Sequence, residues 1–250
     1  MSLATVDIMV VLPEIVISVM ACLILVLDLY LPARFRMQTG FVLTLAILLA
    51  ATLIILFSSV SDSVVGLNGM VVKDRISDLL KCGICLISAG VFLYSRRYAI
   101  ERGFWRGEYL VLGLFAVVGM MIMTSANHLL TVYVGVELLA LCLYAMVGMQ
   151  RDSVSASEAA MKLFVLGALA SGVLLYGMSL LYGLTGTLMI SDISVAVTRF
   201  GPPDLPLLLA LILVVVGLLF KIGAVPFHMW VPDVYDGAPA STTLFIAAAP

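Results

Sequence analysis

One lysine, Lys221, lies inside a long apolar stretch where a charged side chain is costly. It follows the apolar run 207–220 and precedes Gly223 and Pro226. An ionisable side chain inside a membrane span costs on the order of a few kcal/mol, and such residues generally mark an ion or proton path. Pro226 cannot donate a backbone hydrogen bond and its ring crowds the carbonyl of Ile222, so we expect the helix to open just beyond the lysine. Irregular backbone at membrane depth lines protein or a hydrated cavity. The alternative is a lysine that extends to the inner interface.

A carboxylic acid, Glu137, lies inside a second apolar stretch and supplies the opposite charge. Eight or nine residues separate it from the outer boundary of that stretch. At about 1.5 Å per helical residue, it lies roughly 13 Å deep, near the centre of a bilayer. A carboxylate at that depth needs a cation or water beside it. Glu137 is therefore predicted to act with Lys221, and the alternative is a neutral glutamic acid that is hydrogen-bonded to a neighbouring helix.

A second lysine, Lys162, has two interpretations that the sequence leaves open. It stands four residues after Glu158, so the two side chains share one helix face. At a surface such a pair contributes only a few tenths of a kcal/mol. Alternatively, Lys162 connects Glu137 to Lys221 as an intermediate in a charged path.

The two histidines and one further lysine are weaker candidates. His228 directly follows the expected helix break, and an imidazole there could titrate and pass protons, so we expect it to take part in the path. His128 stands beside another span. Lys81 is expected at an interface, together with Asp78. The small residues Gly167 and Ser171 predict close helix packing.

The whole composition fits a membrane protein. Hydrophobic residues make up 63% of the 250 residues and charged ones 11%, against about 25% in an average soluble domain. The predicted fold is an all-α, polytopic transmembrane helix bundle of about eight spans with a discontinuous helix near Pro226. The eighth span begins near Ser241 and is too short to cross a bilayer by Pro250, so we expect the natural protein to continue. The other spans are predicted near Ile8–Leu31, Gly40–Val60, Ile76–Tyr94, Leu110–Ala126, Leu129–Met149, Ala159–Leu184 and Leu205–Val225.

Charge and cysteine usage limit the orientation and the ligands. A net charge of −2 provides no basic surface for nucleic acid. Seven cations follow spans 1, 3 and 5 and three follow spans 2 and 6, which predicts that the N-terminus is outside. These are Arg34, Arg36, Arg96, Arg97, Arg102, Arg106 and Arg151 against Lys73, Arg75 and Arg199. The four cysteines, Cys22, Cys82, Cys85 and Cys142, lie in apolar stretches without the spacing of a metal site.

The run from Phe220 to Ala240, FKIGAVPFHMWVPDVYDGAPA, together with Glu137, resembles the antiporter-like membrane subunits of proton-pumping NADH:quinone oxidoreductase, respiratory complex I. Within that family it is most similar to the subunit N group, because Leu12-Pro-Glu opens the first span and Glu158-Ala-Ala-Met-Lys opens the sixth. The resemblance extends from about Leu12 to Pro250. It implies an antiporter-like inverted-repeat fold, with the first three helices in residues 1–106 and the incomplete first repeat in residues 107–250.

The resemblance also implies roles and partners. Glu137 would be the acidic partner in span 5, Lys221 the basic residue of the discontinuous span 7 and Lys162 a connecting lysine, all in proton translocation. The chain would bind no cofactor itself, while NADH, FMN, iron–sulfur clusters and quinone belong to the whole complex, with its other membrane and peripheral subunits as partners. It would lie in a bacterial inner membrane or, alternatively, an organellar one. The rival functions are an Mrp-type cation/proton antiporter, a membrane-hydrogenase subunit and a structural scaffold.

Overall fold

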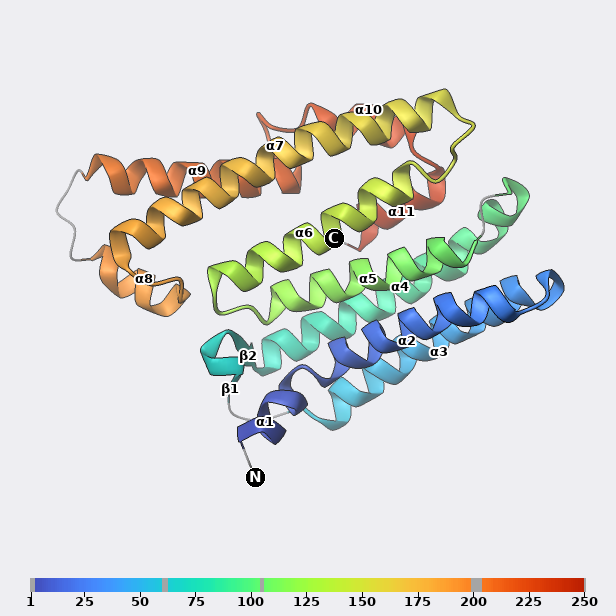
Figure 1. The fold of residues 1–250 in the computed structure, drawn as a ribbon, viewed down its shortest axis with the longest axis horizontal. Coiled ribbons are helices and arrows are strands. Elements are labelled where there is room, and N and C mark those ends of the chain that lie inside the picture. The colour runs from blue at the N-terminus through green and yellow to red at the C-terminus, as the bar shows by residue number, and fades with distance from the viewer. Residues whose placement is uncertain (1–2, 60–62, 104–105, 199–203, 250) are drawn as a thin grey trace.

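The computed structural model describes residues 3–59, 63–103, 106–198 and 204–249, which form helices and one short hairpin (Figure 1). Arg199 and Pro250, on which two of the expectations rest, lie outside these residues. The helices are α1 (Leu3–Val10), α2 (Leu12–Tyr30), α3 (Ala33–Phe57), α4 (Arg75–Glu101), α5 (Gly107–Thr124), α6 (Leu129–Val147), α7 (Val154–Thr185), α8 (Ile190–Val197), α9 (Leu205–Ile222), α10 (Trp230–Gly237) and α11 (Ala240–Ala248); the strands β1 (Val64–Gly66) and β2 (Val71–Lys73) pair antiparallel.

The predicted spans are confirmed, with one correction at the first. Among the described residues, seven helices are long and apolar enough to cross a membrane: α2, α3, α4, α5, α6, α7 and α9. The first expected span, however, is interrupted at Val11, where α1 gives way to α2. Pro13 explains the interruption, because proline has no N–H to donate and its ring crowds the carbonyl four residues earlier. Proline is well tolerated in the first turn of the new helix.

The long helices lie side by side, with their axes roughly aligned (Figure 1). Helices α2, α3 and α4 lie on one side, α7 and α9 on the other, and α5 and α6 between them. Helices α5 and α6 touch backbone to backbone, since a β-carbon added at Gly119 would come within 2.8 Å of the carbonyl oxygen of Gly135. Close approach through small residues is a common way for helices to associate in lipid.

The largest apolar core joins α2, α3, α4 and α5, and it also includes Phe245 of α11. Helix α5 contributes most of its length to this core, and its residues 110–123 carry no polar side chain. The core therefore continues across residue 106, the expected boundary between the first three helices and the repeat. Packing alone does not separate two domains at that point.

The discontinuous helix is confirmed, and it breaks directly after Lys221. Helix α9 ends at Ile222, and Gly223 follows in the left-handed conformation with φ of 71°. The N–H of Gly223 and that of Ala224 cap the carbonyls of Phe220 and Leu219. Glycine adopts this conformation without the steric cost of a β-carbon, which is why helices commonly end at it. The expected clash of Pro226 with Ile222 is consistent with the same end point.

Candidate functional site

The structure brings Lys221 and Glu137 together across the interface of α9 and α6. Lys221 Nζ lies 3.2 Å from Glu137 Oε1, and their side chains retain only 14% and 23% of their solvent exposure. The two residues are 84 positions apart in sequence. Removing one partner of such a pair leaves a poorly solvated charge, which is strongly unfavourable. The pair therefore makes the charge of each residue depend on the state of the other.

Two hydroxyl groups complete the surroundings of this pair. Tyr144 Oη accepts a hydrogen bond from Lys221 Nζ at 3.3 Å. Ser171, on α7, donates to Glu137 Oε1, and its Oγ also lies 2.9 Å from the carbonyl oxygen of Gly167. The sequence-based interpretation of Ser171 as a packing residue is incomplete, because its hydroxyl reaches the carboxylate. The seven-residue spacing of Glu137 and Tyr144, two helical turns, is the signal that could have identified the tyrosine.

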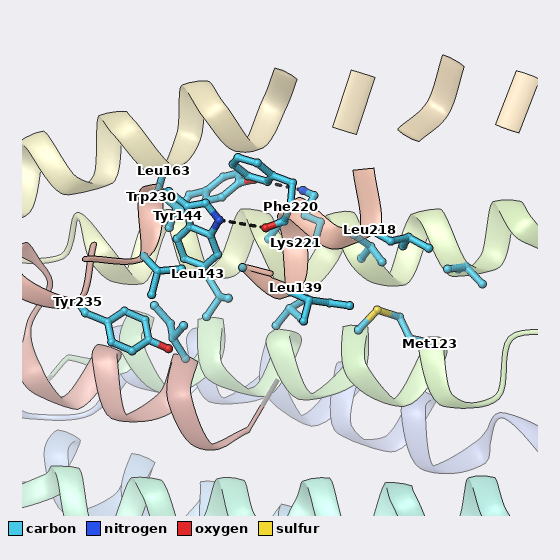
Figure 2. Close-up of a pocket in the computed structure, with 17 residues that line it drawn as sticks. Met123, Leu139, Leu143, Tyr144, Leu163, Leu218, Phe220, Lys221, Trp230 and Tyr235 are labelled. Atoms are coloured by element: carbon cyan, nitrogen blue, oxygen red, sulfur yellow. Dashed lines mark hydrogen bonds between the residues drawn. The ribbon is translucent and has the colours of Figure 1, made fainter. Parts of the chain in front are cut away.

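A cavity of about 430 Å³ opens beside Lys221 between α6, α9 and α10. Its walls are mainly apolar, and Figure 2 shows Phe220, Trp230 and Tyr144 gathered around the lysine. Trp230 Nε1 donates to the carbonyl oxygen of Phe220 at 3.0 Å, which ties α10 back to the end of α9. Lys221 thus lines a cavity that is large enough to hold several water molecules and has few competing polar groups, an arrangement suited to holding and releasing a proton.

Comparison with known proteins decides the family. Residues 126–250 match the family model described as NADH:quinone oxidoreductase/Mrp antiporter, transmembrane. The chain belongs to this antiporter family. The matched segment contains Glu137, Lys162 and Lys221 together with the helix break, so the charged pair and the cavity both lie within the part of the chain that characterises the family.

Curated relatives confirm the resemblance to the subunit N group of this antiporter family. The chain is 54% identical over 98% of its length to NADH-quinone oxidoreductase subunit N of Thioalkalivibrio sulfidiphilus, and it covers 51% of that relative. It is 51% identical over 96% of its length to subunit N of Alkalilimnicola ehrlichii, of which it covers 49%. The chain spans about half the length of the curated relatives it matches.

Solved structures show the same antiporter-like fold. A chain of respiratory complex I from Thermus thermophilus with bound aureothin is 33% identical, with a TM-score of 0.77 over 95% of this chain and 50% of that one. A chain of the Mrp complex from Dietzia is 24% identical, with a TM-score of 0.73 over 97% of this chain and 45% of that one. The identity to the Mrp chain supports a shared fold alone.

Lys162 of this antiporter-family chain lies in a separate charged group. Its Nζ is 2.8 Å from Glu158 Oε1 and 2.8 Å from Asp233 Oδ2, and its side chain remains 43% exposed. The expected pair with Glu158 is confirmed, whereas Asp233 on α10 was not anticipated. No contact recorded for the described residues joins Lys162 to Lys221, so its connecting role stays a prediction. The group instead links the start of α7 to the helix beyond the break.

The structure also places the two histidines and Lys81, the remaining candidate residues. His228 lies in the segment between α9 and α10, where its side chain is exposed and does not line the cavity, so its role in a proton path stays a prediction. His128 Nδ1 caps α6 by accepting from the N–H of Leu130. The expected interface position of Lys81 is corrected, because this lysine is buried and lies 2.5 Å from Glu14 Oε1. Its expected neighbour Asp78 is buried in the same charged group. Glu14 opens α2, and its partner 67 residues later is set by the packing of α2 and α4 and not by local spacing.

Metal ligands do not cluster in the part of the chain that the structure describes. No group of three or more histidine, cysteine or acidic side chains is placed there as a metal ion would require. Cys82 and Cys85 are both buried in α4, and Cys85 Sγ lies 4.0 Å from Met121 Sδ of α5.

Proposed function

We propose that this chain is part of a membrane-arm subunit of NADH:quinone oxidoreductase, of the subunit N kind, and that it translocates protons through Glu137 and Lys221. The single observation that supports this most directly is the 3.2 Å contact of the two side chains beside a broken helix. The curated relatives named for that subunit support the choice of complex. The division into residues 1–106 and 107–250 belongs to the same proposal.

The proposed step is electrostatic. While Glu137 is charged and close, it stabilises the ammonium of Lys221. When the carboxylate is neutralised or turns away, the ammonium is left in a mainly apolar cavity, and it gives its proton to water there. NADH, FMN, iron–sulfur clusters and quinone would be held by other subunits, and their redox chemistry would supply the driving force. Lys162 and His228 are the proposed further stations.

The same proposal covers partners and location. The chain would lie in a bacterial inner membrane with its N-terminus outside, beside other membrane subunits of complex I, among them neighbouring antiporter-like ones, and with the peripheral subunits that oxidise NADH. The excess of cations after spans 1, 3 and 5 supports this orientation. The exposed apolar residues along α2, α3 and α9 support contact with lipid or with other membrane helices.

Replacement of the pair in the assembled complex tests the proposal. We expect Lys221→Ala and Glu137→Ala each to abolish NADH-driven proton uptake into inverted membrane vesicles, while Glu137→Asp, which keeps the charge, retains part of it. Electron transfer from NADH to an artificial acceptor serves as the measure of assembly. Normal pumping by an assembled Lys221→Ala complex would contradict the proposal and favour the scaffold function. If the chain co-purifies with an ion antiporter and not with a quinone reductase, the result would favour the Mrp or membrane-hydrogenase alternative.

A further inference from the structure

The side-chain nitrogen of Lys221 has two hydrogen-bond partners on one helix. Glu137 Oε1 accepts from it at 3.2 Å and Tyr144 Oη at 3.3 Å. Glu137 and Tyr144 are seven residues apart on α6, so their side chains project from the same face two turns apart. The nitrogen lies 5.9 Å from the centre of the tyrosine ring, so the hydroxyl is the closer contact. Lys221 thus lies between a carboxylate and a phenol.

Helix α7 holds the phenol in this position. A β-carbon at Gly167 would overlap Tyr144 Oη, so a larger residue there would displace the hydroxyl. The tyrosine ring also packs edge-on against Phe164, with ring centres 5.8 Å apart. One turn beyond Gly167, Ser171 reaches the carboxylate of Glu137. The same stretch of α7 therefore fixes both partners of the lysine.

The two partners differ in what they offer to a proton. An ionised carboxylate only accepts hydrogen bonds, so it stabilises the charged lysine. A hydroxyl both donates and accepts, so the phenol accepts from the ammonium and donates to the neutral amine after the proton has left. A buried polar atom that loses its partner is costly. The phenol is the group that gives the nitrogen a partner in both states.

We propose that Tyr144 is a positioning residue for proton transfer at Lys221, holding the nitrogen in place while the ion pair with Glu137 opens and closes. This rests on the proposed function, in which Lys221 carries the proton. In the step itself, the proton moves from Lys221 Nζ to water in the cavity. Tyr144 keeps its own proton throughout and only rotates its O–H bond from an accepting to a donating arrangement.

Tyr144→Phe tests this inference because it removes the hydroxyl and keeps the ring. With the full-length chain in its assembled complex, we expect the ratio of protons pumped to NADH oxidised to fall roughly tenfold, as the loss of one hydrogen bond to a charged group predicts. Because the bond to the charged ammonium is stronger than the bond to the neutral amine, its loss disfavours the charged lysine, and we expect the pH at which pumping is half-maximal to fall by up to about one unit. Tyr94→Phe is the matched control, because Tyr94 on α4 is 81% exposed. An unchanged ratio and pH profile in Tyr144→Phe would overturn the inference.

Gly167→Ala provides a second test that leaves every functional group in the chain. The added methyl group displaces the Tyr144 hydroxyl, so we expect the same loss of pumping per assembled complex as in Tyr144→Phe. Gly172→Ala, on the same helix with open space at its β-carbon, is the control. Equal pumping by the two alanine variants would count against the inference. Pumping by Lys221→Ala would refute the proposed function itself, whereas inactive Lys221→Ala beside normal Tyr144→Phe would refute only the role of the tyrosine.

Discussion

Two glutamate–lysine pairs, one buried and one partly buried, join different helices of this molecule in different surroundings. Glu14, in the first turn of α2, and Lys81, inside α4, join these two helices at 2.5 Å, with side chains 8% and 1% exposed. Glu137 and Lys221 lie 3.2 Å apart beside the end of α9 and a cavity, and both contact hydroxyl groups. The same residue types therefore form a closed contact in one place and, in the other, a contact that would open in the proposed step. Under the proposed function, the surroundings of each pair, and not its residue types, would separate a structural role from transport.

The remaining charges near Glu14 and Lys81 support this contrast. Lys73 is buried and donates to Ser58 Oγ at 2.7 Å. Burial lowers the pKa of Lys73, and the nearby Asp78 and Glu14 act in the opposite direction. The group thus has two positive and two negative members at one end of the bundle. The charges in this group therefore balance one another.

The largest expected effect is on the closed pair. Lys81→Ala leaves Glu14 charged and buried, and removal of one partner of a buried pair costs about 3–5 kcal/mol. We therefore expect the amount of assembled subunit in membranes to fall severely, as measured by its abundance and its thermal stability after detergent extraction. Glu101→Ala, which removes an exposed partner of Arg97, is the control with little expected effect. Normal abundance of Lys81→Ala would contradict the closed contact.

Neutral double replacements sharpen the comparison. Replacing both members of a buried pair with uncharged residues of similar size is often tolerated. We expect Glu14→Gln with Lys81→Met to recover both assembly and pumping. We expect Glu137→Gln with Lys221→Met to recover assembly while pumping stays absent, as followed by proton uptake per NADH oxidised. If the Glu14 and Lys81 double variant assembles without pumping, the first pair also takes part in transport and the distinction fails.

The smallest effect concerns the start of α4, the helix that carries Lys81. Asp74 caps this helix by accepting from the N–H of Ser77 at 2.7 Å, and these bonds lower the pKa of the carboxyl group. We expect Asp74→Ala to lower the free energy of unfolding by about 1 kcal/mol. Because the folded-state pKa lies below the unfolded one, the contribution is fully present above the unfolded value near 4 and is lost as the pH falls through the folded value. When the free energy of unfolding is measured from pH 7 to pH 3, the value for the wild type should approach the value for Asp74→Ala as the pH falls. A constant difference across that range would contradict the assignment.

The Glu137–Lys221 pair could be predicted from the sequence more readily than the Glu14–Lys81 pair, for a physical reason. Lys221 and Glu137 each interrupt a long apolar run, so their depth in the membrane is evident from neighbours alone. Glu14 stands in the first turn of its helix and looks like a boundary residue, and only the packing of α2 on α4 buries it against Lys81. Tyr144 and Ser171 are ordinary residues of apolar helices. Their roles depend on which helix lies opposite, and single-sequence periodicity does not specify that.

The apolar length of α5 has a consequence for energy conversion. This helix lies between the helices that carry Glu14 and Lys81 and the helix that carries Glu137. Its residues 110–123 carry no charged, hydroxyl or amide side chain over roughly 21 Å. A proton that reaches one pair has no chain of polar side chains along α5 by which to reach the other. Any polar connection between the two charged groups would therefore have to bypass residues 110–123 of α5.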